Sequence, residues 1–188
     1  MIGFNGGLIG KDRTTTIGTA IGVWTLGEQV KARRGGVWPI TGFAFRYFRW
    51  TITANRTVGS SVSTLTQASE FRIRNGAADV SMASATIAAT TIVESGGTPI
   101  ANLIDGNTAT KMISINETLP RSVTINMGSL IACTGYRWFT ADDASSRDPV
   151  SWTLEGSVDN ITYILLDTKT SFAVTTTRQA EVGPFAFA

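Results

Sequence analysis

The sequence predicts an all-β fold, a jelly-roll β-sandwich preceded by an extended, irregular N-terminal arm. Threonine and serine together make up 43 of the 188 residues, whereas charged residues make up only 16%, a composition typical of short strands and turns. From residue 43 onward, apolar and polar residues alternate with a period of two, as in half-buried strands. Residues 1–42 contain ten glycines and no sustained alternation. We therefore expect an arm at 1–42 and a sandwich domain at 43–188.

The clearest strand is predicted at residues 46–53, where Phe48, Trp50 and Ile52 share one face that we expect to lie in the core. Turn signals rich in glycine, proline, asparagine and aspartate separate the segments that follow. The same reasoning predicts strands at 70–74, 80–82, 86–93, 122–127, 135–140, 150–156, 163–167 and 178–182, and a short helical insertion at 99–104. Many short strands with almost no helix indicate two packed sheets.

The arm is rich in glycine, but apolar residues recur through it, so it is not polar enough for a free linker. It carries five basic and two acidic residues, a net charge of +3. A buried tryptophan removes about 150–250 Å² from water, so we expect Trp24 and Trp38 to be covered by the sandwich, a sister subunit or another protein. An arm folded back on its own domain remains an alternative to docking on a partner.

The composition excludes several chemistries. The chain has no histidine and one cysteine, so it can supply neither a Ser-His-Asp triad nor a histidine- or cysteine-based zinc site. The sequence contains no apolar run of the length that a membrane span requires. The net charge of +2 gives no indication of nucleic-acid binding. We expect Cys133, in an apolar run, to be a buried small hydrophobic residue.

Three stretches of the body resemble the discoidin, or coagulation-factor type C, family. They read NLIDGNTATK at 102–111, YRWFTADD through SWTLEGS at 136–157, and YFRWTITA at 47–54 with ASEF at 68–71. This resemblance implies a galactose-binding-like β-sandwich. Met112 stands where the family usually has tryptophan. The strands at 47–54 and 68–71 open the domain here, although they often close it in the family, so the resemblance implies a permuted strand order.

A second resemblance concerns the arm. GVWTLGEQ at 22–29, followed by Arg33-Arg34 and by VWP at 37–39, is similar to a short segment found in structural proteins of tailed bacteriophages. The similarity implies a role in the virion. The similarity also implies that five residues of the arm dock on a partner: Trp24, Leu26, Arg33, Arg34 and Trp38.

The loop that follows residue 104 contains a compact run of oxygen donors. Calcium prefers about six to eight oxygen ligands, and the corresponding loop in discoidin-like domains often holds a structural calcium ion. The resemblance therefore implies a calcium site at Asp105, Asn107 and Thr110, with a second carboxylate from Glu70 or Glu181 left open. The alternative is an Asp-Gly turn closed by the aspartate side chain.

A second loop gathers Asp142, Asp143, Arg147 and Asp148 beside Trp138. These residues could bind a sugar, with Trp138 as a stacking platform. They could instead form ion pairs that hold the loop in place, or act as the paired carboxylates of a glycoside hydrolase. Because adjacent residues of an extended chain point to opposite sides, Asp142 and Asp143 are poorly placed for paired catalysis. The remaining tryptophans of the body lie on alternating strands and are expected in the core.

Together these observations predict a non-enzymatic structural protein of a bacteriophage virion, as a tail, fibre or capsid decoration component. The arm would dock on other virion proteins of the capsid or tail, and the sandwich would be displayed and could bind a host surface glycan. Virion symmetry leads us to expect a homo-oligomer, most simply a trimer. The main rival is a stand-alone carbohydrate-binding, lectin-like module in which residues 1–42 are a linker.

Overall fold

The computed structural model describes residues 43–58, 61–89, 96–115 and 118–187. The chain divides into two units between Phe43 and Ala44, and the second unit contains the sandwich. The docking residues predicted in the arm lie outside the described residues. Within the described residues, no helix has the length and apolar character needed to cross a membrane.

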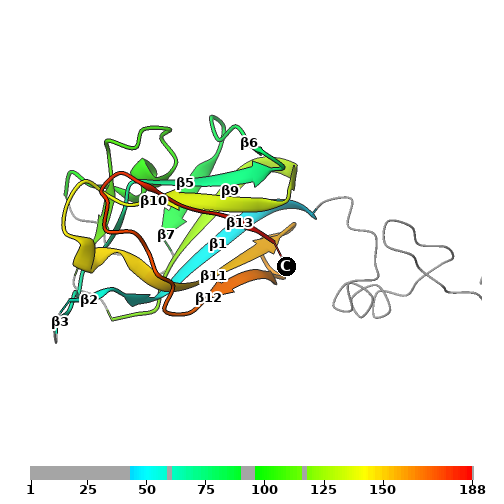
Figure 1. The fold of residues 1–188 in the computed structure, drawn as a ribbon. Coiled ribbons are helices and arrows are strands. Elements are labelled where there is room, and N and C mark those ends of the chain that lie inside the picture. Colours follow the sequence, from blue (N-terminus) through cyan, green and yellow to red (C-terminus); the bar gives the residue numbers. More distant parts are fainter. Residues whose placement is uncertain (1–42, 59–60, 90–95, 116–117, 188) are drawn as a thin grey trace, which may run out of the picture. The chain divides into compact units, whose positions relative to one another are not determined.

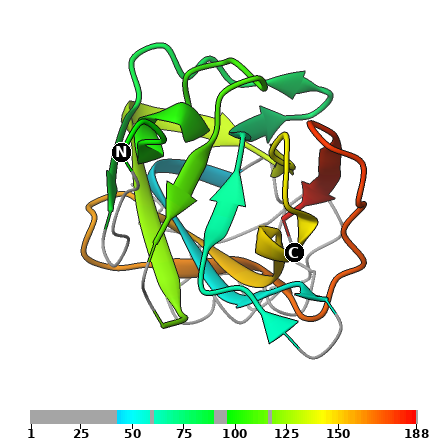
Figure 2. The ribbon, with the colours of Figure 1, turned by 90° about the vertical axis from the view of Figure 1, so that its left-hand side faces the viewer.

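Two antiparallel sheets form the body, as Figures 1 and 2 show from two directions. The five-stranded sheet has the order β12-β11-β1-β9-β7, and the four-stranded sheet has the order β13-β10-β5-β6. The strands of the first sheet are β12 (Ile164–Lys169), β11 (Pro149–Ser157), β1 (Phe43–Asn55), β9 (Arg121–Cys133) and β7 (Thr86–Ala89); those of the second are β13 (Glu181–Ala186), β10 (Gly135–Phe139), β5 (Glu70–Asn75) and β6 (Ala78–Asp79). This architecture confirms the predicted all-β sandwich.

Smaller elements complete the fold. The described residues contain two 3-10 turns, and the first of them, η1 (Ile100–Leu103), lies within the helical insertion predicted at 99–104. Two further pairs of short strands, β2 with β3 and β4 with β8, lie outside the two main sheets. These elements are β2 (Thr57–Val58), β3 (Ser61–Val62), β4 (Thr66–Ala68), β8 (Met112–Ser114), η1 (Ile100–Leu103) and η2 (Ser145–Arg147).

Aromatic rings from both sheets meet in the core. Trp50 of β1 packs on Phe71 of β5, with 5.2 Å between ring centroids. Trp138 of β10 packs on Trp50 at 5.8 Å and edge-on against Trp152 of β11 at 5.7 Å. All four side chains are fully buried, and such pairs stabilise a core by about 0.5–1.5 kcal/mol each beyond the burial of their area. The two sheets are thus held together by packing of large rings.

The predicted alternation of the first strand is correct. Phe48, Trp50 and Ile52 are all fully buried. Strand β1 lies between β9 and β11 in the middle of the five-stranded sheet. It pairs antiparallel with β11, with Tyr47 opposite Ser157. A strand paired on both sides has a defined register, and this fixes which side chains point away from the core.

Two predicted strands are displaced in the structure. The segment expected at 178–182 becomes a strand only from Glu181, because the Arg178 side chain binds Asp148 and Gln179 has a left-handed backbone, with φ of 55°. The segment expected at 80–82 lies beyond the end of β6 at Asp79, the short strand that pairs with β5 across a turn at Gly76. The first boundary is thus set by a contact with a residue distant in the sequence, and the second by the tight hairpin of β5 and β6.

Candidate functional site

Three loops meet at one end of the sandwich: 104–111, 140–148 and 175–180. Gln179 donates from Nε2 to the carbonyl of Thr108 at 3.3 Å, and Arg178 donates from Nη1 to the carbonyl of Asp143 at 2.8 Å. The two candidate sites predicted from the sequence, the oxygen-rich loop and the acidic loop, are therefore neighbours in space. We call this region the loop end.

Asp142 and Asp143 both contact the same lysine. Lys111 Nζ lies 2.6 Å from Asp142 Oδ1 and 2.8 Å from Asp143 Oδ1. The expectation that these two carboxylates point to opposite sides is wrong, because they lie in a bend and not in an extended strand. Burial raises the pKa of Asp143, but the hydrogen bond and charge of Lys111 outweigh this effect and the net shift is downward. Asp143 is thus held ionised, a poor state for a general acid.

Arg147 extends this charge cluster. Its Nη1 lies 3.6 Å from Asp143 Oδ2, which is the loop-holding ion pair considered from the sequence. About half of the Asp142 and Asp143 side-chain surfaces is exposed, so these carboxylates remain within reach of a ligand. Exposed pairs of this kind contribute little to stability, about 0–1 kcal/mol each.

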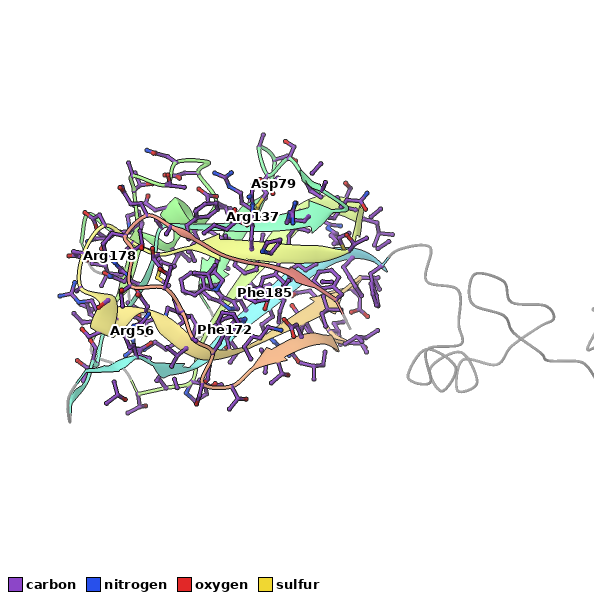
Figure 3. All side chains as sticks on the ribbon, viewed as in Figure 1. Arg56, Asp79, Arg137, Phe172, Arg178 and Phe185 are labelled. Carbon is purple, nitrogen blue, oxygen red and sulfur yellow. The ribbon has the colours of Figure 1, made fainter. Side chains whose placement is uncertain are left out.

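Asp148 does not belong to the exposed cluster. Its side chain is completely buried and accepts two hydrogen bonds from Arg178, at 3.0 Å and 2.6 Å. Arg56 Nη2 lies 3.5 Å from the same carboxylate and also donates to the carbonyl of Val174 at 2.7 Å. Figure 3 places Arg56 and Arg178 at the same end of the sandwich. The predicted ligand-binding role of Asp148 is therefore wrong, because its oxygens are buried against two arginines.

Trp138 is not a stacking platform either. The side chain is fully buried between Trp50 and Trp152, so the expected surface role is wrong. Its neighbour Phe139 is the ring that faces away from the core, and the Arg72 and Arg137 guanidinium groups lie 5.0 Å and 5.4 Å from its centroid. The position of Arg137 between two inward-facing aromatic residues is the sequence signal that could have settled the choice.

The oxygen-rich loop folds into a closed turn. Asp105 Oδ1 accepts from the Asn107 backbone N–H at 2.8 Å, and Asp105 Oδ2 accepts from the Thr110 hydroxyl at 2.6 Å. Asn107 Oδ1 accepts from the Ala109 N–H at 3.0 Å. Gly106 has φ of 79°, a conformation that glycine adopts without strain. The Asp-Gly turn considered from the sequence is present, and the three predicted calcium ligands lie together in it.

Glu70 brings a second carboxylate to this turn. It is almost fully buried, and its Oε2 atom has no hydrogen-bond partner among the described residues. Burial raises the Glu70 pKa to about 7; Asp105 adds to the rise, while Arg72 and the N–H groups of Gly106 and Asn107 oppose it. A buried carboxylate oxygen without a partner is costly, and a cation beside it would remove that cost. The donor set therefore fits a calcium ion.

Glu181, the other carboxylate left open by the sequence, is used elsewhere. Its Oε2 atom lies 2.6 Å from Arg137 Nη1. The described residues contain no group of three or more histidine, cysteine, aspartate or glutamate side chains placed to hold a metal. A cation at this turn would thus depend on two carboxylates supplemented by amide, hydroxyl and backbone oxygens, all of which are hard ligands suited to calcium.

The docking residues Trp24, Leu26, Arg33, Arg34 and Trp38 lie outside the described residues, so the structure does not place them. The two resemblances stay predictions. Comparisons of the chain with protein families, with curated proteins and with solved structures found no match.

Proposed function

We propose that the chain is a structural component of a bacteriophage virion, attached by residues 1–42 and displaying the sandwich. The proposal has two parts, attachment and display, and the sandwich itself is the observation that supports display. The described residues alone supply two sheets and a core of packed aromatic rings from both, so a folded body is available to be carried by an arm. The attachment half depends on the sequence similarity at 22–39.

The loop end supports a structural role more than a catalytic one. Asp142 and Asp143 both form ion pairs with Lys111, and Asp148 is buried against Arg178. A glycoside hydrolase needs one carboxylate that retains a proton and a second that is free to act. These three carboxylates instead tie loops together, as expected for a displayed domain that keeps its shape.

Complementation in the phage that carries this gene tests the proposal. Particles grown with the full chain should contain the protein, whereas a variant that lacks residues 2–42 should fold but be absent from purified particles, as judged by mass spectrometry. The full-length double variant Trp24→Ala, Trp38→Ala should behave like the deletion. Ile161→Ala, which alters an exposed residue of the sandwich, is the matched control and should be incorporated normally.

Two results would contradict the proposal. One is a truncated chain present in particles at the full-length level. The other is a full-length chain that is absent from mature particles.

We also propose a structural calcium ion at the turn 105–110, held by Glu70 and Asp105 with Asn107 and Thr110 as neutral oxygen donors. Bound calcium would stabilise the folded chain by mass action, so adding calcium after treatment with a chelator should raise the thermal unfolding midpoint. Asp105→Asn should abolish this increase, while Asp142→Asn, at the same loop end, should preserve it. An unchanged midpoint in the unmodified chain would contradict the site.

A further inference from the structure

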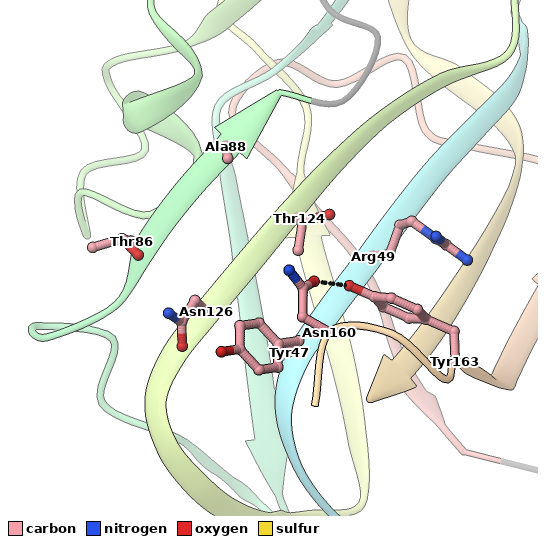
Figure 4. Close-up of a pocket in the computed structure, with 8 residues that line it drawn as sticks. All are labelled: Tyr47, Arg49, Thr86, Ala88, Thr124, Asn126, Asn160 and Tyr163. Carbon is pink, nitrogen blue, oxygen red and sulfur yellow. Dashed lines mark hydrogen bonds between the residues drawn. The ribbon is translucent and has the colours of Figure 1, made fainter. Parts of the chain in front are cut away.

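A pocket of about 410 Å³ lies on the outer face of the five-stranded sheet (Figure 4), and none of its described lining residues belongs to the three loops of the loop end. Volumes of about 300–1,000 Å³ are typical of sites for small ligands. The pocket is lined by side chains from three neighbouring strands, β1, β9 and β7, and from the loop between β11 and β12. The sequence pattern alone predicts none of these lining residues as ligand-binding residues.

Strand geometry explains how the lining residues come together. Tyr47 and Arg49 flank the fully buried Phe48 on β1, so both point away from the core. On β9, Asn126 lies between the buried residues Ile125 and Met127. Because β1 and β9 are hydrogen-bonded neighbours, these outward positions form one continuous polar surface.

The loop that forms the wall of the pocket is held by its own hydrogen bonds. Asp159 accepts from the backbone N–H groups of Ile161 and Thr162 at 2.9 Å and 2.8 Å, and from the hydroxyl of Ser157 at 2.9 Å. These bonds lower the pKa of Asp159. Asn160 has a left-handed backbone, with φ of 63°, which asparagine tolerates better than most residues. The wall is thus organised before any ligand arrives.

Tyr163 and Arg49 position each other. The Arg49 guanidinium lies 3.9 Å from the centroid of the Tyr163 ring, and its Nε lies 2.7 Å from Glu155 Oε2. The Tyr163 hydroxyl is hydrogen-bonded to Asn160 Oδ1, as Figure 4 shows. The rings of Tyr47 and Tyr163 therefore line the same pocket as a fixed guanidinium group and a fixed amide.

Several hydrogen-bond donors of this pocket have no partner among the described residues. Asn160 uses its oxygen for Tyr163, and Asn126 uses its oxygen for Arg46 and for the Gly128 N–H. The amide nitrogens of both asparagines therefore remain available to a ligand. Arg49 uses Nε for Glu155, which leaves its terminal nitrogens available in the same way. A ligand for this pocket should offer several oxygen acceptors beside an apolar face that packs on a tyrosine ring.

We infer that this pocket binds a neutral saccharide. Hydroxyl oxygens can accept from the amides of Asn126 and Asn160 and from Arg49, while the C–H face of a pyranose ring can pack on Tyr47 or Tyr163. Among the lining residues that the structure describes, Arg49 is the only charged one, and its charge is compensated by Glu155 at 2.7 Å. These described lining residues thus carry little net charge of their own, and the neighbouring Arg46 guanidinium is engaged by Asn126 Oδ1 and the Tyr47 ring. A neutral sugar therefore fits better than a uronate or a sulfated sugar, and the anionic probes below test this choice against the charge of Arg46.

This inference deepens the proposed function, because a displayed domain that binds sugars could bring a particle to a glycan surface. The biological purpose of sugar binding therefore rests on the proposed function. It also moves saccharide binding from the loop end to the sheet. The two proposals can fail separately, since attachment is measured in particles and sugar binding is measured with the purified chain.

The test is a binding assay with the full-length chain. Immobilised neutral oligosaccharides of glucose, galactose, mannose and N-acetylglucosamine are the probes, with sialylated and sulfated oligosaccharides beside them. We expect at least one neutral probe to bind, and its affinity to fall by at least about tenfold, or about 1.4 kcal/mol, in Tyr47→Ala and in Asn160→Gly. Glycine keeps the left-handed backbone at position 160, so Asn160→Gly preserves the backbone of the loop while it removes both the amide and the acceptor of the Tyr163 hydroxyl.

Asp142→Ala is the matched control, since it alters an exposed residue of the loop end and should bind as the unmodified chain does. Thermal unfolding of each variant shows whether it is folded. The inference is overturned if no neutral probe binds, if only anionic probes bind, or if folded Tyr47→Ala and Asn160→Gly variants keep full affinity. Loss of binding in Asp142→Ala alone would return the site to the loop end and also overturn it.

Discussion

Arg178 and Asp148 form a two-point ion pair that joins the loop before β13 to the loop before β11. Arg178 Nη1 lies 3.0 Å from Asp148 Oδ1, and Arg178 Nη2 lies 2.6 Å from Asp148 Oδ2. The carboxylate is completely buried, whereas the arginine side chain keeps 22% of its surface exposed. A planar guanidinium matches both oxygens of a carboxylate at once, so this pair fixes the relative position of the two loops.

Replacement of Asp148 by asparagine should destabilise the fold by about 3 kcal/mol, because removing one partner of a buried pair leaves the other charge without compensation. Urea unfolding measures the change. Asp142→Asn, which alters an exposed carboxylate bound to Lys111, is the control and should cost less than about 1 kcal/mol. An equal loss of unfolding free energy in the two variants would show that the buried pair stabilises the fold no more than the exposed one.

Replacement of Tyr136 by phenylalanine should cost about 1–3 kcal/mol. The Tyr136 hydroxyl accepts from Trp152 Nε1 at 2.6 Å and donates to Asp167 Oδ2 at 2.8 Å. Phenylalanine would leave the buried indole N–H without an acceptor. Chemical denaturation measures the loss, and Tyr47→Phe, at a partly exposed ring outside the core, should change stability by less than about 0.5 kcal/mol. A neutral result for Tyr136→Phe would contradict the hydrogen-bonded chain.

Replacement of Gly135 by alanine should destabilise the sandwich by at least about 2 kcal/mol. A Cβ at this position would lie 2.1 Å from the Phe185 carbonyl oxygen on the paired strand β13, and a backbone atom in a sheet cannot move aside cheaply. At Gly96, a Cβ would meet nothing within 4 Å, so Gly96→Ala should be tolerated. Thermal unfolding of the two variants tests the close approach of β10 and β13, and equal midpoints would contradict it.

Glu70 should make the fold less stable as the pH rises. Its pKa is about 7 in the folded chain, against an ordinary value of 4.5, so between these values the folded chain binds a proton that the unfolded chain has released. Stability from this group therefore falls as the pH rises from 4.5 to 7, by a total on the order of 3 kcal/mol.

Unfolding free energies of the unmodified chain and of Glu70→Gln, both measured with a chelator, isolate this effect from other carboxylates. The stability of Glu70→Gln relative to the unmodified chain should increase between pH 5 and about pH 8. A constant difference over this range would contradict the raised pKa.

The alternation of polar and apolar residues predicted the faces of the long strands because the pleat of a strand imposes a period of two. It placed Phe48, Trp50 and Ile52 in the core, where they lie. At the adjacent apolar residues Trp138 and Phe139, the polar residue Arg137 sets the phase of the alternation and assigns Trp138 to the inward face. There the inward position belongs to Trp138, which shares its face with the buried Tyr136.

Contacts between residues far apart in the sequence could not be predicted. Arg178 is 30 residues from Asp148, and no local pattern links them, so the sequence alone groups Asp148 with the exposed aspartates beside it. The pocket on the sheet also depends on residues that are far apart in the sequence. Its lining comes from strands β1, β9 and β7, which are neighbours in space but not in sequence order. Only the strand topology brings Tyr47 and Asn126 together.

The central position of β1 has a consequence for the order in which the chain can fold during synthesis. This strand leaves the ribosome before the rest of the sandwich, but its partner β11 begins about 100 residues later. Contacts between distant segments form slowly because a long loop must close first. The aromatic residues of the nascent strand therefore stay exposed until most of the domain has been translated. During that interval the exposed residues can aggregate or bind chaperones.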